Sequence, residues 1–482
     1  MGVRSRNSLA LKLALLALYL PLLVCPVMAD GLELRQQIDQ LLDDPCLDHG
    51  VQGVVIRSAD TGDTLYERGG DLALIPASNM KLLVSSAALL CLGPDFTWVT
   101  EVLASGPIDS NGTLEGDLII RGGGDATLDT EGLRELARRI KSAGIVKVKG
   151  AVVADDTAFD GRRLGWGWSW DDEPYYYSAQ ISALCLNRNT VDVWVYPGRS
   201  AGSPAVIRTV PPTNLVTVES TATTGRADSE KTIRVNRKRG LNVIQVSGSI
   251  PEGQYPEQRE APATVEDPAL YAGDVFRTEL TRQGILVAGG LRSGAAPEDA
   301  VLIVKRTSPP LSHVLALLNK PSDNLIAEVL LKSLGRAVKG SGTTEAGIEA
   351  VMEVFAQVGM DTGAIRMVDG SGLSRLNLVT ARSIAALLGY MRVHPQWNVF
   401  VNSLPTAGVD GTLRGRMKGT AAEGRVRAKT GYLSRVSSLS GYVNTRSGER
   451  LVFSILMNNH LCRNDEARAV QDRICALLAS LP

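Results

Sequence analysis

The sequence predicts an α+β protein of more than one domain, in which a cluster of helices packs on an antiparallel sheet and a large strand-rich segment interrupts that unit. With 482 residues, the chain is longer than a single hydrophobic core usually serves. Motifs at 78–81, 322–324 and 429–431, described below, lead us to assign residues 30–95 and 305–482 to one domain. Residues 96–304 are rich in glycine and short strand patterns, and we expect them to form an insert of two nested subdomains.

The elements of the larger unit are predicted from the spacing of apolar residues and from the turn residues between them. Helices are predicted at 31–44, 322–334, 344–359, 380–392 and 464–480. Strands are predicted at 425–432, 437–445 and 450–457, with NTRSGE as the turn of the last hairpin. The helix at 464–480 should pack on the sheet beside the helix at 31–44. Within the insert we expect a hairpin at 231–250 and a lone helix at 267–284.

The N-terminus has the pattern of a secretory signal peptide. Arg4, Arg6 and Lys12 precede an apolar run, and the small-residue motif VMA at 27–29 ends it. We therefore expect residues 1–29 to be removed and the mature protein to be periplasmic. Removing three of the 51 basic residues leaves 48 Lys and Arg against 51 Asp and Glu. This balance gives no electrostatic case for binding nucleic acid.

Ser78 and Lys81 stand at the start of an apolar helical stretch, PASNMKLLVSSAALLCLGP (76–94). Residues three apart share a helix face, so the hydroxyl and the amine can meet. Taken alone, the pair also fits a helix cap and a lysine that extends to water. Its interpretation therefore depends on the rest of the chain.

Histidine and cysteine offer no competing chemistry. The four histidines, His49, His313, His394 and His460, are scattered without metal-ligand spacing. Five cysteines remain after signal cleavage, an odd number whose pairing stays open: Cys46, Cys91, Cys185, Cys462 and Cys475. We expect neither a metal nor another cofactor, and a lysine rather than a histidine becomes the candidate base for a serine nucleophile.

Two further motifs complete a set with Ser78 and Lys81. SDN at 322–324 precedes another apolar helix, and KTG at 429–431 lies on a strand-like segment. Each alone fits a helix cap or an ordinary strand end. Together and in this order, the three motifs are those of penicillin-binding proteins and class A β-lactamases.

The motifs and their surroundings resemble the class C low-molecular-mass penicillin-binding proteins, the D-alanyl-D-alanine carboxypeptidase/endopeptidase family. Ser78 and Ser322 are 244 residues apart, so a large insert separates the first two motifs. Further phrases of the family occur as RGGGDATL (121–128), DDTAFDG (155–161), SALCLNRNTVDVWVYPG (182–198) and VDGSGLSRLN (368–377). The resemblance spans nearly the whole mature chain and implies a serine β-lactamase/transpeptidase-like catalytic domain.

The resemblance implies an acyl-enzyme mechanism on peptidoglycan stem peptides, as a D-Ala-D-Ala carboxypeptidase, a D,D-endopeptidase or both. Ser78 would be the nucleophile, Lys81 its base, and Ser322 a proton relay to the departing amine. The residues expected to bind the substrate carboxylate, backbone and oxyanion are Asn324, Lys429, Thr430, Gly431 and Tyr432. A β-lactam should acylate the same serine and leave slowly.

The stretch GWGWSWDDEPYYY (165–177) is by composition more typical of core or interdomain packing than of a binding surface. The resemblance instead implies that it reaches over the cleft. Trp168 would form a wall, Asp171 would receive the cationic end of a diamino acid, and Arg375 would meet its carboxylate. Such a pocket suits a zwitterionic group such as meso-diaminopimelate.

Two other functions remain as alternatives. One is a catalytically idle penicillin- and peptidoglycan-binding wall protein, against which the intact motifs argue. The other is a β-lactamase, against which the length of the insert argues. The sequence leaves open a transpeptidase variant of the same chemistry, the balance of carboxypeptidase and endopeptidase activity, the role of the insert and the oligomeric state.

Overall fold

The computed structural model describes residues 26–253, 260 and 262–482. Most of the predicted signal peptide lies outside these residues, and its last four residues begin helix α2 (Pro26–Leu42), which includes most of the helix predicted at 31–44. Within the described ranges, no helix is both long enough and apolar enough to cross a membrane. The five cysteines beyond the predicted cleavage point are free thiols.

A five-stranded antiparallel sheet forms the centre of the larger unit, in the order β2-β1-β23-β22-β21. Its strands are β1 (Val51–Ser58), β2 (Thr64–Arg68), β21 (Val426–Leu433), β22 (Val436–Asn444) and β23 (Arg450–Asn458). The last three confirm the predicted C-terminal strands and their hairpin turn. Strands β1 and β2 were not predicted, because short apolar runs do not separate strand from helix by periodicity alone.

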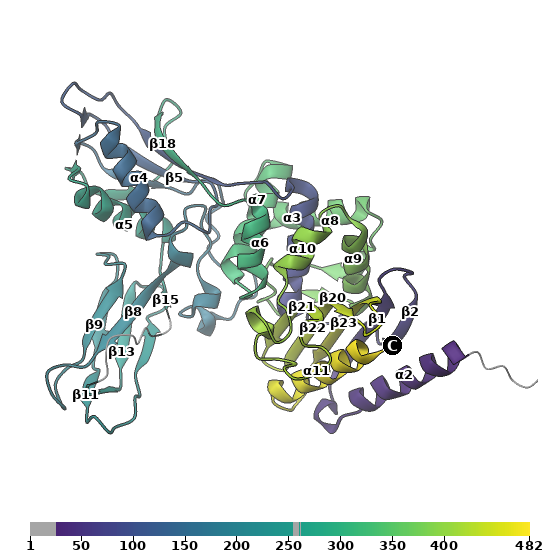
Figure 1. Ribbon diagram of the computed structural model, residues 1–482. Coiled ribbons are helices and arrows are strands. Elements are labelled where there is room, and N and C mark those ends of the chain that lie inside the picture. Colours follow the sequence, from purple (N-terminus) through teal and green to yellow (C-terminus); the bar gives the residue numbers. More distant parts are fainter. Residues whose placement is uncertain (1–25, 254–259, 261) are drawn as a thin grey trace, which may run out of the picture.

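Helices cover both faces of this sheet (Figure 1). The helices are α3 (Met80–Leu92), α6 (Leu311–Asn319), α7 (Asn324–Lys339), α8 (Thr344–Gln357), α9 (Ala381–Val393), α10 (Trp397–Ser403) and α11 (Asn464–Ser480). Helix α11 packs on the sheet beside α2, as predicted, and the remaining helices gather on the other face. Alternate residues of the strands point to the two faces, so Ile56 and Phe453 pack under α2 and α11, whereas Val55 and Val452 pack under the helix cluster.

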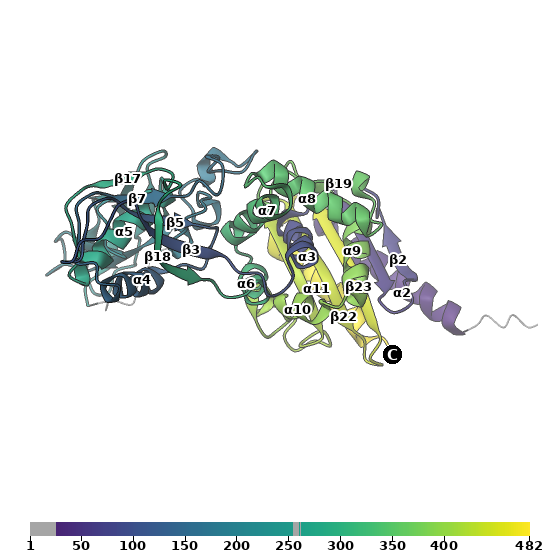
Figure 2. The ribbon, with the colours of Figure 1, turned by 90° about the horizontal axis from the view of Figure 1, so that it is seen from above.

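The chain between α3 and α6, called the insert below, stands to one side of this unit (Figures 1 and 2). Its larger sheet has the order β17-β7-β5-β3-β18. The strands and helices around this sheet are β3 (Val99–Ala104), β4 (Thr113–Leu114), β5 (Leu118–Gly122), α4 (Thr130–Ser142), β6 (Lys147–Val148), β7 (Val152–Asp155), α5 (Pro268–Arg282), β16 (Leu286–Val287), β17 (Leu291–Ser293) and β18 (Val301–Thr307).

The prediction of a lone helix in the insert is wrong, because α4 is a second one. Asp129 caps its first turn by accepting from the Gly132 N–H at 2.8 Å, and Leu133, Leu136 and Ile140 are buried on one face. The other face carries a dense run of charged residues, which hid the apolar stripe in the sequence.

A second group of strands in the insert lies below the first sheet and its helices in Figure 1. These strands are β8 (Thr190–Tyr196), β9 (Val206–Val210), β10 (Thr217–Ser220), β11 (Thr223–Gly225), β12 (Arg234–Arg237), β13 (Val243–Ser247), β14 (Ser249–Pro251) and β15 (Ala263–Thr264). Strands β12 and β13 pair antiparallel and confirm the predicted hairpin. The short strands β19 (Ile365–Arg366) and β20 (Leu378–Val379) pair with each other in the larger unit. The loop between them forms part of the site described below.

Candidate active site

Ser78 lies in a short 3₁₀-helical turn (Ala77–Asn79) just before α3, and that turn packs against strand β21. The Asn79 side-chain amide fastens the turn by donating to the carbonyl oxygen of Lys429 at 3.0 Å. Gly431 permits the contact, because a Cβ at this position would lie 2.7 Å from the Pro76 carbonyl oxygen. The sequence therefore brings the SxxK serine against the strand that carries KTG.

Lys81 is fully buried on the first turn of α3. Its Nζ donates to the hydroxyl of Ser78 at 3.0 Å, to Oδ1 of Asn324 at 2.7 Å and to the carbonyl oxygen of Ser371 at 2.6 Å. All three donor positions of the ammonium are thus used, and one of them points at the serine.

Burial lowers the pKa of Lys81 to about 8, because the charged form is poorly solvated there. The carboxylates of Asp369, Glu328 and Asp323 act in the opposite direction and limit the fall. Burial raises the pKa of Glu328 in turn to about 7, with the charge of Asp369 as the next cause. The pKa of Lys81 is therefore close enough to neutral pH for the amine to lose its proton, as a general base must.

Lys429 is the second fully buried lysine of the site. Its Nζ donates to the Ser322 hydroxyl at 2.8 Å and to the Thr430 carbonyl oxygen at 2.9 Å. Burial, and next the charge of Lys81, hold the pKa of Lys429 well below its usual value. No carboxylate is bonded to Lys429 in the part of the chain that the structure describes. The site thus contains two lysine–hydroxyl pairs whose positive charges disfavour each other.

The SDN motif enters the site at the start of α7, which begins at Asn324, two residues after the predicted start at 322. Ser322 has a left-handed backbone with φ 65°, and Asp323 caps the helix by accepting from the Ile326 N–H at 2.9 Å. The side-chain amide of Asn324 donates to the carbonyl oxygen of Tyr177, from the insert, at 2.7 Å. Asn324 therefore joins Lys81 to the insert rather than presenting its whole amide to the cleft.

A loop of residues 368–377, buried at 369–372, supports Lys81. Glu328 on α7 accepts from the backbone N–H groups of Gly370 and Ser371, the latter at 2.7 Å. This fixes the Ser371 carbonyl oxygen that Lys81 donates to. Gly372 has φ 79°, and a Cβ there would lie 1.8 Å from the Ala77 carbonyl oxygen, so only glycine lets the loop approach the Ser78 turn.

A cavity of about 1510 Å³ lies between the larger unit and the insert. The predicted site residues that line it are Ser78, Trp168, Asp171, Ser322, Asn324, Arg375, Thr430 and Tyr432. Lys81, Lys429 and Gly431 lie just beneath this surface, in contact with those residues. The structure thus brings every predicted site residue to one cavity.

The insert supplies one wall of this cavity. The Trp168 indole N–H donates to Asp369 at 2.9 Å, which ties the wall to the loop beneath Lys81. Asp171 is exposed, and Arg375 across the cavity donates to the Ser434 carbonyl oxygen at 2.7 Å. Trp170 is 72% exposed, so the aromatic stretch is in part surface rather than the packing that its composition favoured.

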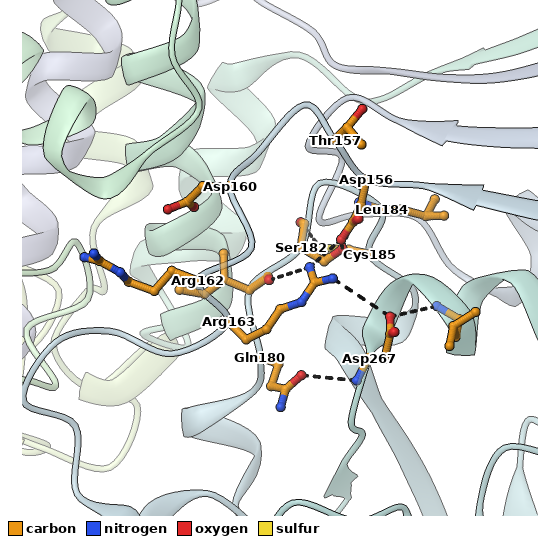
Figure 3. Close-up of polar contacts among 12 residues, drawn as sticks. Asp156, Thr157, Asp160, Arg162, Arg163, Gln180, Ser182, Leu184, Cys185 and Asp267 are labelled. Carbon is orange, nitrogen blue, oxygen red and sulfur yellow. Dashed lines mark hydrogen bonds and ion pairs between the residues drawn. The ribbon is translucent and has the colours of Figure 1, made fainter. Parts of the chain in front are cut away.

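Arg163 anchors the stretch that carries Trp168 and Asp171 (Figure 3). Its guanidinium is ion-paired with Asp156, and Asp267 lies 3.9 Å away. Ser182, at the far end of the stretch, donates to the same Asp156 at 2.7 Å. The two ends of the wall are therefore held at one point of the insert.

Sequence reasoning missed several residues of the site. Thr412 shares a hydrogen bond of 2.7 Å with the hydroxyl of Thr430, and both line the cavity. Glu328 and Asp369 act through backbone N–H groups of a loop that no pattern connects to α7. Asp369 does lie within VDGSGLSRLN, which the resemblance had marked without giving it a role.

No group of three or more His, Cys, Asp or Glu side chains among the described residues is placed to hold a metal ion. The buried amines of Lys81 and Lys429 are instead hydrogen-bonded to hydroxyl, amide and carbonyl oxygens of the site.

Comparisons with known proteins place the chain in a family. A sequence model of the D-Ala-D-Ala carboxypeptidase 3 (S13) family matches residues 34–481. A D-alanyl-D-alanine carboxypeptidase of Actinomadura sp. (strain R39) is 42% identical over 473 residues, which cover 94% of this chain and 87% of the relative.

Solved structures extend the likeness to the fold. The crystal structure of penicillin binding protein 4 (dacB) from Haemophilus influenzae is similar with a TM-score of 0.79 and 26% identity, covering 91% of this chain and 97% of that one. The same protein complexed with a β-lactam has a TM-score of 0.74 and 25% identity, covering 91% and 98% of the two chains. The α+β fold class predicted from the sequence is confirmed.

Proposed function

The chain belongs to the D-Ala-D-Ala carboxypeptidase 3 (S13) family, and we propose that it hydrolyses the terminal D-Ala-D-Ala bond of peptidoglycan stem peptides through an acyl-enzyme on Ser78. One observation carries this proposal. The Lys81–Ser78 pair at 3.0 Å and the Lys429–Ser322 pair at 2.8 Å belong to the same cavity. A nucleophile with its base and a cation with a proton-carrying hydroxyl are the groups that acyl transfer requires.

In the first step, the Ser78 hydroxyl oxygen attacks the carbonyl carbon of the penultimate D-Ala while its proton passes to Lys81 Nζ. The oxyanion that forms would lie between the backbone N–H groups of Ser78 and Tyr432. When the C–N bond breaks, the leaving amine takes a proton through Ser322, which accepts from Lys429 in the structure. D-Ala leaves and Ser78 carries the acyl group as an ester.

Lys81 must be neutral to begin this step, and the charge of Lys429 helps to remove the proton from it. Each charge disfavours the other, since the charge of Lys81 lowers the pKa of Lys429. A substrate carboxylate arriving at Lys429 and Thr430 would hold a proton on Lys429. The same event lowers the proton affinity of Lys81, so substrate binding itself frees the base.

Hydrolysis repeats the steps in reverse, with water in place of the amine. A water molecule loses its proton through the same groups, attacks the ester carbon and releases Ser78 with its proton restored. A β-lactam presents a carboxylate and a strained amide, and its ring-opened remainder stays attached, so it should acylate Ser78 and leave slowly.

The insert wall supports a stem peptide as the substrate rather than an arbitrary peptide. Asp171 and Arg375 offer opposite charges on the same cavity, which suits a third residue whose side chain ends in both an amine and a carboxylate. The cavity volume of about 1510 Å³ leaves room for a second peptide, and we therefore include D,D-endopeptidase activity on crosslinked peptides in the proposal.

The location and the domain division belong to the same proposal. Such a substrate lies outside the cytoplasmic membrane, in agreement with the signal pattern at residues 1–29. We also propose residues 30–95 with 305–482 as the catalytic domain and 96–304 as an insert of two nested subdomains. One hydrophobic cluster lies entirely within the insert and supports this division. Six buried residues of the insert nevertheless join a cluster of the catalytic domain: Trp98, Ala126, Phe159, Ile181, Ala183 and Cys185.

Incubation with a defined pentapeptide and with a crosslinked muropeptide, followed by mass analysis, tests the function. We expect loss of one D-Ala from the pentapeptide and cleavage of the crosslink, both absent with Ser78→Ala. Release of nothing from either substrate by the unmodified protein would refute the enzymatic proposal and favour a binding protein.

A further inference from the structure

Arg188 reaches from the insert to the SDN motif. Its Nε lies 2.9 Å from Oδ2 of Asp323, and its Nη1 donates to the carbonyl oxygen of Ala126. Asp323 uses its other oxygen, Oδ1, to cap α7. The carboxylate beside Ser322 is thus held from both sides, by the helix it caps and by a cation of the insert.

The backbone that presents Arg188 is strained. Three consecutive residues are left-handed, with φ values of 48° at Asn187, 59° at Arg188 and 55° at Asn189. Asparagine tolerates this region better than most residues, but arginine seldom adopts it. Strain of this kind persists where the surrounding structure over-determines the backbone, and it gathers at functional sites.

The insert fixes this turn on both sides of Arg188. The Asn187 amide donates to the Thr130 hydroxyl at 2.9 Å. Asn189 accepts from the Leu186 N–H at 3.0 Å and donates to the Gln180 carbonyl oxygen at 2.8 Å. The side chains of Asn187 and Asn189 therefore stabilise the turn, whereas that of Arg188 extends toward the larger unit.

The residue that precedes the target of Arg188 is strained as well. Ser322, next to Asp323, is left-handed with φ 65°, although its hydroxyl must meet Lys429 at 2.8 Å. Asn324, the residue after Asp323, makes a second contact with the insert by donating to the Tyr177 carbonyl oxygen. Two successive residues of the SDN motif are therefore fixed by the insert.

We propose that Arg188 is a positioning residue, which holds Asp323 and so keeps Ser322 and Asn324 in the arrangement that acylation needs. The inference rests on the proposed function. It means that the insert serves the reaction of every substrate, including a small β-lactam that does not reach Asp171. The insert is then part of the catalytic framework and not only a specificity wall.

The test compares Arg188→Met with Arg121→Met in the full-length protein. Arg121 forms an ion pair of 2.6 Å with Glu101 at similar exposure, but within the insert sheet and away from the motifs. We expect the maximal rate of acylation by fluorescent penicillin to fall at least tenfold in Arg188→Met, with little change in the concentration at half-maximal rate. Arg121→Met should acylate like the unmodified protein, and added guanidinium should partly restore only the Arg188 variant.

Asp323→Asn separates positioning from folding, since the amide keeps an oxygen that can cap α7 and loses the ion pair. If Arg188 acts through Asp323, the double variant Arg188→Met/Asp323→Asn should be no slower than the worse single variant. If the double variant were instead slower by the product of the two single effects on the acylation rate, the proposal would be overturned. It would also be overturned by an unchanged acylation rate in Arg188→Met, or by a change confined to the half-saturating concentration, which would make Arg188 a substrate ligand. If the unmodified protein were not acylated at Ser78 at all, the proposed function would fail first.

Discussion

The two walls of the cavity differ in how far their polar groups are satisfied before a substrate arrives. On the wall formed by α3, α7 and β21, Lys81 and Lys429 are fully buried, and each donates to at least two oxygens. On the insert wall, Asp171 is exposed, and so is Arg375 across from it. Groups fixed in a dry environment can stabilise a transition state without rearranging, whereas exposed charges mainly select among ligands. We therefore expect mutations on the first wall to lower kcat/KM for every stem-peptide substrate and those on the second to affect selectivity.

The largest effect is expected from Ser78→Ala and Lys81→Ala. Each should abolish acylation, by about six orders of magnitude or to background, because nucleophile and base act as one unit. Single-turnover labelling with fluorescent penicillin measures this rate. An unchanged rate in Lys81→Ala would exclude that lysine as the base.

Lys429→Ala should weaken substrate capture by about one to two orders of magnitude in kcat/KM, since a charge-assisted contact with the substrate carboxylate is lost. The matched comparison is a peptide whose C-terminus is an amide. The unmodified protein should already process it poorly, and the variant should lose less on it than on the free carboxylate, since only the contact with Ser322 is then removed. Equal losses on both peptides would mean that Lys429 acts through Ser322 and not by binding the carboxylate.

The pH dependence comes next and tests the shared proton of the two lysines. The active free enzyme carries one proton on the pair, and that proton moves from Lys81 to Lys429 when the substrate carboxylate arrives. Above the pKa of Lys81, about 8, the proton is lost and no cation is left to bind the carboxylate. We therefore expect kcat/KM to decline as pH rises through that value. Glu328→Gln should move this decline to lower pH, since the carboxylate raises the pKa of Lys81. A rate that instead rises through pH 8 would show that Lys429 keeps its proton without substrate.

The smallest effect should come from the insert wall. Asp171→Ala should lower kcat/KM about tenfold for peptides whose third side chain ends in a free amine, by loss of one charge-assisted contact. The quantity to measure is kcat/KM for such a peptide divided by kcat/KM for an acyl-D-Ala-D-Ala peptide without the amine. Equal losses on both peptides would make Asp171 a structural residue and contradict the difference between the two walls.

The sequence was informative where a pattern is local. The strands β21 to β23 alternate and end at turn residues, and the helices from α7 to α9 have clear periodicity, so all were predictable. Ser78 and Lys81 are neighbours on a turn and a helix, and their contact follows from spacing. Strand β1 was missed because its burial depends on β2 and β23, which pair with it from both sides.

The supports of the site could not be predicted, because they connect distant segments through the backbone. The hydrogen bonds of Glu328 connect it to Lys81 through the backbone of Ser371. Arg188 reaches Asp323 only because a strained turn directs it there. Neither contact leaves a spacing in the sequence that chemistry alone would identify.

Trapping the acyl-enzyme with a natural stem peptide tests the central claim most directly. The protein is mixed with a D-Ala-D-Ala pentapeptide, quenched in acid within one turnover, digested and analysed by mass spectrometry. The account predicts that the peptide containing Ser78 gains the mass of the substrate less one D-alanine, and that this adduct is absent in Ser78→Ala. Turnover without any adduct on Ser78, or an adduct on another residue, would contradict it.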